Sequence, residues 1–308
     1  MTAPTQRFKK SFLHPRYWFT WFGLGVLFLL VQLPYPVLYR LGVWLGRTSM
    51  RFLKRRVSIT RRNLQLCFPD MDSDLLEHKI VSNFESLGMG LLETGMAWFW
   101  SDARVKRWFD VSGLNNLKMA QQNNQGVLII GVHFMSLELG GRAMGLCQPM
   151  MAMYRPHNNK VMEFVQTWGR MRSNKAMLDR KDLRGMVHAL KRGEAVWFAP
   201  DQDYGPRGSV FAPLFAVDQA ATTSGTFMLA RLAKPALVSV VLVRKEKGAG
   251  YELMIQPELK NYPIDDELAA AAYMNRVVEK EIMRAPEQYL WLHRRFKTRP
   301  EGAPSLYL

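Results

Sequence analysis

Residues 126–141 constrain the fold of this chain more than any other segment. The first seven, GVLIIGV, include five apolar side chains, four of them β-branched, which predicts a buried parallel strand without polar alternation. His133 follows this strand directly, and Ser136 can cap the helix expected next. Open α/β sheets bind ligands at the carboxyl ends of their strands, so His133 lies where chemistry is expected.

An acid follows the histidine at a useful spacing. Glu138 comes five positions after His133, and we expect its carboxylate to fold back and accept a hydrogen bond from one imidazole nitrogen. The other nitrogen would then take a proton from a substrate hydroxyl. This predicts His133 as a general base and Glu138 as its orienting group. The alternative is purely structural, with a histidine that ends a strand and an acid in a first helical turn.

The amino-terminal quarter carries most of the positive charge. Residues 1–69 hold twelve Lys and Arg and no Asp or Glu, in a chain of net charge +16. The charges flank an uncharged, aromatic-rich stretch over residues 17–33, at the lower limit of length for a spanning helix. Because the stretch lacks a small-residue cleavage site, it predicts a membrane anchor rather than a signal peptide. The basic residues over 40–62 favour the cytoplasmic side, with a single-pass or a re-entrant anchor.

The chain is therefore expected to have two parts. Residues 1–62 would form the membrane anchor and a basic amphipathic region suited to anionic lipid. Residues 63–308 would form one α/β catalytic domain. Further buried strands are expected over residues 150–154, 195–199, 236–243 and 251–255, the last two as a hairpin, with helices between strands and a final helix over 265–284. This alternation predicts a mostly parallel sheet covered by helices.

Segments along nearly the whole chain resemble the late acyltransferases of bacterial lipid A biosynthesis, part of a superfamily marked by His-x4-Asp. The similar segments are residues 14–18, 32–36, 93–98, 133–138, 154–156, 199–205 and 293–297. Glu138 replaces the Asp of the superfamily, as in the lipid A subgroup. Residues 131–159 look more like the palmitoleoyl branch than the lauroyl branch.

The resemblance implies a reaction and its partners. A palmitoleoyl or lauroyl chain would pass from acyl carrier protein to the hydroxyl of an acyl chain on a Kdo-bearing lipid A precursor, Kdo2-lipid IVA. The enzyme would lie at the inner membrane with its catalytic domain on the cytoplasmic side. The thioester donor is already activated, so no Ser or Cys nucleophile is needed, and no cofactor or metal is expected.

The resemblance also extends to residues that would bind the polyanionic acceptor. Arg170 resembles a functional arginine of the group, and Asp201 resembles a functional acid, although a turn or cap would equally explain an acid at a strand end. Arg172 and Lys175 belong to the same basic run as Arg170 and are expected to assist it. The basic run over residues 294–297 suits a solvated or lipid-facing patch as well as a ligand site.

Two other functions stay open at this point. Charge alone would suit a membrane-tethered binder of nucleic acid or another polyanion, but the chain carries no recognition motif, so no nucleic-acid partner is expected. An acyltransferase acting on a glycerolipid phosphate is the alternative enzyme. That branch carries Asp where this chain carries Glu138, which favours the lipid A acceptor.

Overall fold

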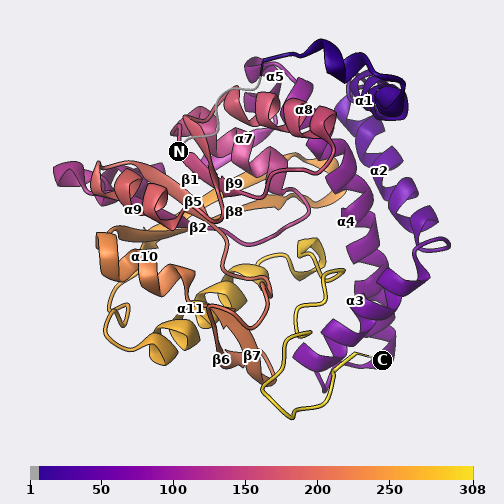
Figure 1. Ribbon diagram of the computed structural model, residues 1–308. Helices are drawn as coiled ribbons and strands as arrows, with labels where there is room; N and C mark the ends of the chain where they lie inside the picture. The colour runs from indigo at the N-terminus through magenta and orange to yellow at the C-terminus, as the bar shows by residue number, and fades with distance from the viewer. Residues whose placement is uncertain (1–6, 308) are drawn as a thin grey trace.

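A computed structural model of the chain describes residues 7–307 (Figure 1). Residues 1–6 of the predicted anchor region lie outside the described part. A seven-stranded sheet forms the centre, with helices on both of its faces, and a two-stranded hairpin lies apart from it. The mixed α/β fold expected from the sequence is confirmed.

The elements follow the order of the labels in Figure 1. The helices are α1 Trp18–Leu30, α2 Tyr35–Ser49, α3 Lys54–Cys67, α4 Ser73–Phe99, α5 Asp102–Lys106, α6 Leu114–Ala120, α7 Leu137–Cys147, α8 Lys160–Met171, α9 Leu183–Lys191, α10 Gly225–Ala233 and α11 Glu267–Ile282. The strands are β1 Phe109–Ser112, β2 Val127–Ile130, β3 Met151–Tyr154, β4 Ala176–Asp179, β5 Ala195–Phe198, β6 Ser209–Leu214, β7 Val217–Thr223, β8 Ala236–Arg244 and β9 Tyr251–Glu258.

The sheet is mostly parallel, as predicted. Its strand order is β1-β9-β8-β2-β5-β3-β4, and each neighbouring pair is parallel except the β8–β9 hairpin. The sequence analysis did not predict β1, β4 or the β6–β7 hairpin. β1 is largely exposed and only four residues long, and β7 is polar at Asp218 and Gln219, so neither shows the apolar run that marked the other strands.

Strand β2 lies in the middle of the sheet, and all four of its residues are buried. Val127 and Ile129 pack in the core cluster that includes residues of α4 and α7, whereas Leu128 and Ile130 pack with residues of α9, α10 and α11. A strand covered on both faces needs no polar alternation, which explains the continuous apolar run in the sequence.

The amino-terminal helices pack against the rest of the protein. α2 lies along α4, and Gly46 brings the two backbones so close that a Cβ there would lie 2.0 Å from the carbonyl oxygen of Phe84. α3 crosses the boundary that the sequence analysis placed at residue 62, and the division into two parts stays a prediction.

The expected spanning anchor is not confirmed. The helix found in residues 17–33 is α1, with 13 residues, whereas about 20 are needed to cross a bilayer. Within residues 7–307, the structure contains no helix of sufficient length and apolar character to span a membrane.

Candidate active site

His133 lies just beyond the carboxyl end of β2, as the sequence predicts. Its main chain is held on two sides: the amide donates to Asp201 Oδ2 at 2.9 Å, and the carbonyl accepts from the amide of Leu290 at 3.0 Å. The side chain is 19% exposed and lines a cavity. A rigid backbone and a partly open ring are what a general base requires.

Asp201 is the acid that contacts the imidazole. Its Oδ1 lies 2.7 Å from Nδ1 of His133, and the carboxylate is fully buried. Burial by itself would raise the pKa of Asp201, but the charge and hydrogen bonds of His133 outweigh it and lower that pKa below its ordinary value. An ionised Asp201 accepts a hydrogen bond from Nδ1–H, so the proton stays on Nδ1 and Nε2 is the basic nitrogen.

The expected hydrogen bond between Glu138 and His133 is therefore not formed. Both carboxylate oxygens of Glu138 instead accept hydrogen bonds from Arg170, from Nε at 3.1 Å and from Nη2. Trp98 Nε1 and Gln166 Nε2 each donate to the same carboxylate at 3.3 Å. A bidentate guanidinium suits a partly buried carboxylate better than one imidazole nitrogen, and it binds both oxygens.

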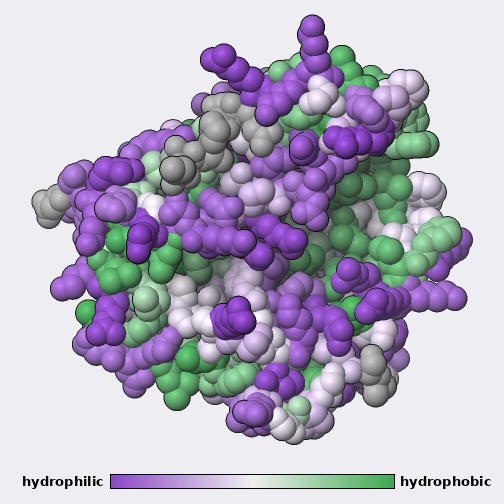
Figure 2. All heavy atoms as spheres, in the orientation of Figure 1, coloured by the Kyte–Doolittle hydropathy of each residue, from purple (hydrophilic) through white to green (hydrophobic). Residues whose placement is uncertain are grey.

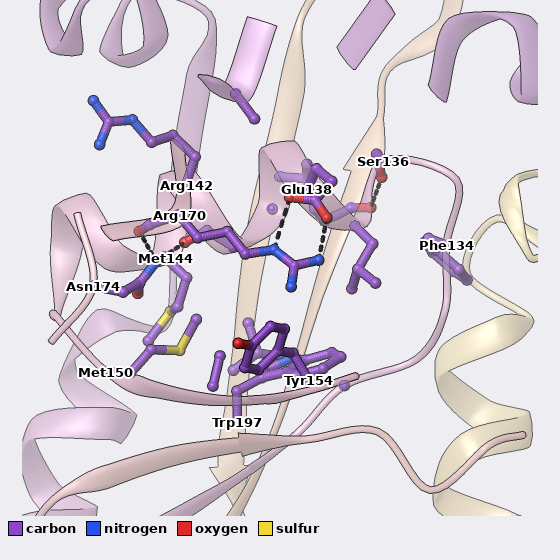
Figure 3. A pocket seen from close by; sticks show the side chains of 18 of the residues that line it. Phe134, Ser136, Glu138, Arg142, Met144, Met150, Tyr154, Arg170, Asn174 and Trp197 are labelled. Carbon is purple, nitrogen blue, oxygen red and sulfur yellow. Dashed lines mark hydrogen bonds and ion pairs between the residues drawn. The ribbon is translucent and has the colours of Figure 1, made fainter. Parts of the chain in front are cut away.

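The opposite charges of Glu138 and Arg170 stabilise each other. Burial would raise the pKa of Glu138, but the charge and hydrogen bonds of Arg170 overcome that effect and hold the pKa below its ordinary value. Burial likewise opposes the charge of Arg170, yet Glu138 raises the pKa of the guanidinium overall. The pair is thus a stable ion pair beside the histidine, and Figure 3 shows the two side chains facing each other.

The structure separates Arg170 from the two other predicted cations. Arg170 lines the same cavity as His133. The guanidinium of Arg172 instead donates to the carbonyl oxygen of Trp98 and lies 5.4 Å from the centroid of the Trp168 ring. Lys175 pairs with Glu194 at 2.6 Å. Their expected role with the acceptor stays a prediction.

The cavity beside His133 has a volume of about 210 Å³ and is polar in one part and apolar in another. The polar part of its lining includes His133, Glu138 and Arg170. The apolar lining includes Met144, Met150, Met177, Trp197, Val240 and Leu253. In Figure 3, Met144 and Met150 lie to one side of the Arg170–Glu138 pair, and Tyr154 and Trp197 lie below it.

Helices α4, α7 and α8 and several strands of the sheet surround the cavity. α4 contributes Ala97 and Trp98 to its wall. On the face drawn in Figure 2, hydrophobic side chains gather in a hollow alongside that helix. The sequence analysis did not single out Trp98, Gln166 or Trp197, because a residue of α4, of α8 or of a buried strand gives no local signal that it reaches the cavity.

The arrangement suits one kind of chemistry. A buried carboxylate fixes the tautomer of a partly exposed imidazole, and an apolar cavity begins beside it, so the site can deprotonate a hydroxyl next to a hydrocarbon chain. Within residues 7–307, no group of three or more His, Cys, Asp or Glu side chains is arranged to hold a metal ion.

Comparison with known proteins gives the class of this site. Residues 5–298 match the family described as bacterial lipid A biosynthesis acyltransferase. A lipid A biosynthesis palmitoleoyltransferase of Escherichia coli K12 is 66% identical over 305 residues, covering 99% of both chains. A lipid A biosynthesis lauroyltransferase of the same organism is 58% identical over 98% of both chains, and an acyltransferase of Haemophilus influenzae is 46% identical over 98% of this chain and 97% of its own.

These matches cover nearly the whole sequence, so the chain belongs to the bacterial lipid A biosynthesis acyltransferases. It is an enzyme, an acyltransferase of lipid A biosynthesis, as the resemblance implied.

Proposed function

We propose that this enzyme transfers a palmitoleoyl or lauroyl chain from acyl carrier protein to the hydroxyl of an acyl chain on Kdo2-lipid IVA. The observation that carries the proposal is that His133, paired with Asp201, lines a cavity with a large apolar part. The higher identity to a palmitoleoyltransferase than to a lauroyltransferase favours the palmitoleoyl chain.

The proposed step uses His133 as the base. Nε2 accepts the proton of the acceptor hydroxyl while the oxygen attacks the thioester carbonyl carbon. The carbon–sulfur bond then breaks, the proton passes from the imidazolium to the departing thiolate, and an ester and a free thiol result. Asp201 keeps the proton on Nδ1 and stabilises the imidazolium in the transition state. In this proposal Asp201 orients the base rather than binding the acceptor.

We assign Glu138 and Arg170 a different part in the reaction. Nε and Nη2 of Arg170 are both bonded to Glu138, which fixes the plane of the guanidinium and leaves Nη1 available for an oxygen atom of a substrate. Glu138 thus positions Arg170, and Arg170 binds substrate. Arg172 and Lys175 would add positive charge near the phosphorylated acceptor without entering the cavity.

We also propose attachment to the cytoplasmic face of the inner membrane through the amino-terminal helices. Large apolar side chains there are exposed to a degree unusual for a water-facing surface, such as Phe19 at 90% and Phe22 at 72% in α1 and Phe52 at 81% after α2. The neighbouring α3 begins with Lys54, Arg55 and Arg56, which suit an anionic lipid surface. This attachment would bring the cavity to a membrane-embedded acceptor.

A reconstituted assay tests the proposed reaction. The purified full-length enzyme is incubated with palmitoleoyl or lauroyl acyl carrier protein and either Kdo2-lipid IVA or glycerol 3-phosphate, and products are identified by mass spectrometry. We expect one acyl chain to be added to Kdo2-lipid IVA and none to glycerol 3-phosphate. Acylation of glycerol 3-phosphate alone would instead establish the glycerolipid alternative, and salt-sensitive binding to a DNA duplex without transfer would establish a nucleic-acid binder.

A further inference from the structure

Helix α7 carries three glycines, and two of them have a clear packing reason. A Cβ at Gly145 would lie 2.7 Å from Asn174 Oδ1, and one at Gly140 would lie 3.2 Å from the Cβ of Leu242. Side chains at these two positions would press on neighbouring elements. Each glycine inside a helix costs about 1 kcal/mol relative to alanine, so each needs such a reason.

Gly141 has no such reason. A Cβ built at this position meets no atom within 4 Å, and its φ is not in the left-handed region. Neither packing nor backbone conformation requires glycine here. The position nevertheless borders the cavity beside His133.

The place of Gly141 on the helix explains what the missing side chain does. Leu137 and Glu138 lie one turn before it and Met144 nearly one turn after it, and all three line the same cavity. Gly141 therefore lies between the polar Glu138 and the apolar Met144 on the cavity-facing side of α7. Gly141 lines the cavity and a Cβ there would meet no atom within 4 Å, so a larger side chain would extend into open space at the cavity wall.

We propose that Gly141 sets the length of the acyl chain that the enzyme accepts from its donor. The inference rests on the proposed acyl transfer and adds to it a position that determines specificity. The chain passes the Cα of Gly141 on its way to the methionine-lined part of the cavity. Because a hydrophobic pocket discriminates one methylene by roughly 10- to 200-fold, a side chain in this path changes the preferred donor.

The test compares Gly141→Ala and Gly141→Leu with the wild-type enzyme. The kcat/KM is measured in detergent with decanoyl, lauroyl, myristoyl and palmitoleoyl acyl carrier protein and Kdo2-lipid IVA. We expect the ratio of short-chain to long-chain kcat/KM to rise by about 10- to 100-fold for Gly141→Leu, and less for Gly141→Ala. Gly141→Ala should also unfold at an equal or higher temperature, because alanine favours the helix.

Gly23→Leu is the matched control. Gly23 is also a helical glycine with no atom within 4 Å of a built Cβ, but it lies in α1, away from the cavity lining. It should leave the donor ratio unchanged. If Gly141→Leu lowers kcat/KM equally for every donor, so that the donor ratio is unchanged, the inference is overturned. If the wild-type enzyme uses none of the four donors, the proposed function itself is overturned.

Discussion

His133 and Asp201 occupy equivalent positions just beyond the carboxyl ends of two neighbouring parallel strands, β2 and β5. Ile130, the last residue of β2, pairs with Phe198, the last residue of β5, and each functional residue follows three positions beyond the end of its strand. The register of the sheet thus continues into the site and brings the imidazole Nδ1 within 2.7 Å of the carboxylate. Parallel strands end at the same edge, so two short loops suffice to assemble a base and its orienting acid.

Asp201→Asn should lower kcat by about 10²- to 10⁴-fold, as His133→Ala should, because the amide no longer fixes the tautomer of the imidazole. The double variant should be only slightly slower than either single variant, since the two residues act as a unit. Steady-state kinetics with palmitoleoyl acyl carrier protein and Kdo2-lipid IVA measure this, and circular dichroism confirms the fold. Losses that multiply in the double variant would show that the residues act independently.

Glu138→Gln should impair the enzyme less than His133→Ala, because the structure gives Glu138 the task of holding Arg170. Its main effect should be a higher KM for Kdo2-lipid IVA, and Arg170→Lys, which loses bidentate geometry but keeps the charge, should act similarly. Varying each substrate in turn separates these effects. A fall in kcat as deep as that of His133→Ala, with KM unchanged, would place Glu138 in the proton transfer instead.

Gly46→Ala should lower the free energy of unfolding by about 1–3 kcal/mol, because the added methyl group would clash with the backbone of α4. Denaturant unfolding measures the free-energy change. Gly25→Ala is the control, because a Cβ at Gly25 in α1 meets nothing within 4 Å and should cost nothing. Equal stability of the two variants would contradict the close packing of α2 on α4.

Stability should fall as the pH is lowered from 6.5 towards 4, in part because of His293. Burial and the positive charges of Lys297 and His133 lower the pKa of His293 from its ordinary 6.5 to about 4. Between these values the unfolded chain binds a proton that the folded protein does not, so the free energy of unfolding decreases as the pH falls. This loss of stability is absent above about pH 6.5, where His293 is neutral in both states, and is complete near pH 4, where the folded protein also binds the proton.

The measurement is the free energy of unfolding across that pH range for the wild-type protein and for His293→Gln. The variant cannot take up this proton in either state, so its stability should depend less steeply on pH in the same range. Parallel curves would show that His293 does not contribute.

Local patterns were sufficient to predict several elements of the fold. The apolar runs of β2, β3, β5 and β8 and the hairpin partner β9 lie where the sequence places them, within a few residues. Strand β1 was missed because three of its four residues are exposed and it has no apolar run, and β4 was missed because only three apolar residues precede the polar Asp179. The β6–β7 hairpin was missed because its hydrophobic residues pack on α11 and the carboxyl-terminal segment, contacts that the sequence does not display.

By itself the sequence determined that His133 follows a buried strand, that Glu138 lies at the start of the next helix, and that the amino-terminal quarter is strongly basic. These are local properties of spacing, periodicity and composition. Only the tertiary structure decided which acid faces the imidazole. Asp201 is 68 positions away along the chain and becomes a neighbour through strand pairing, whereas Glu138, only five positions away, projects from α7 toward α8 and meets Arg170. Sequence distance limits which groups can meet, but the register of the sheet and the packing of helices determine which ones do.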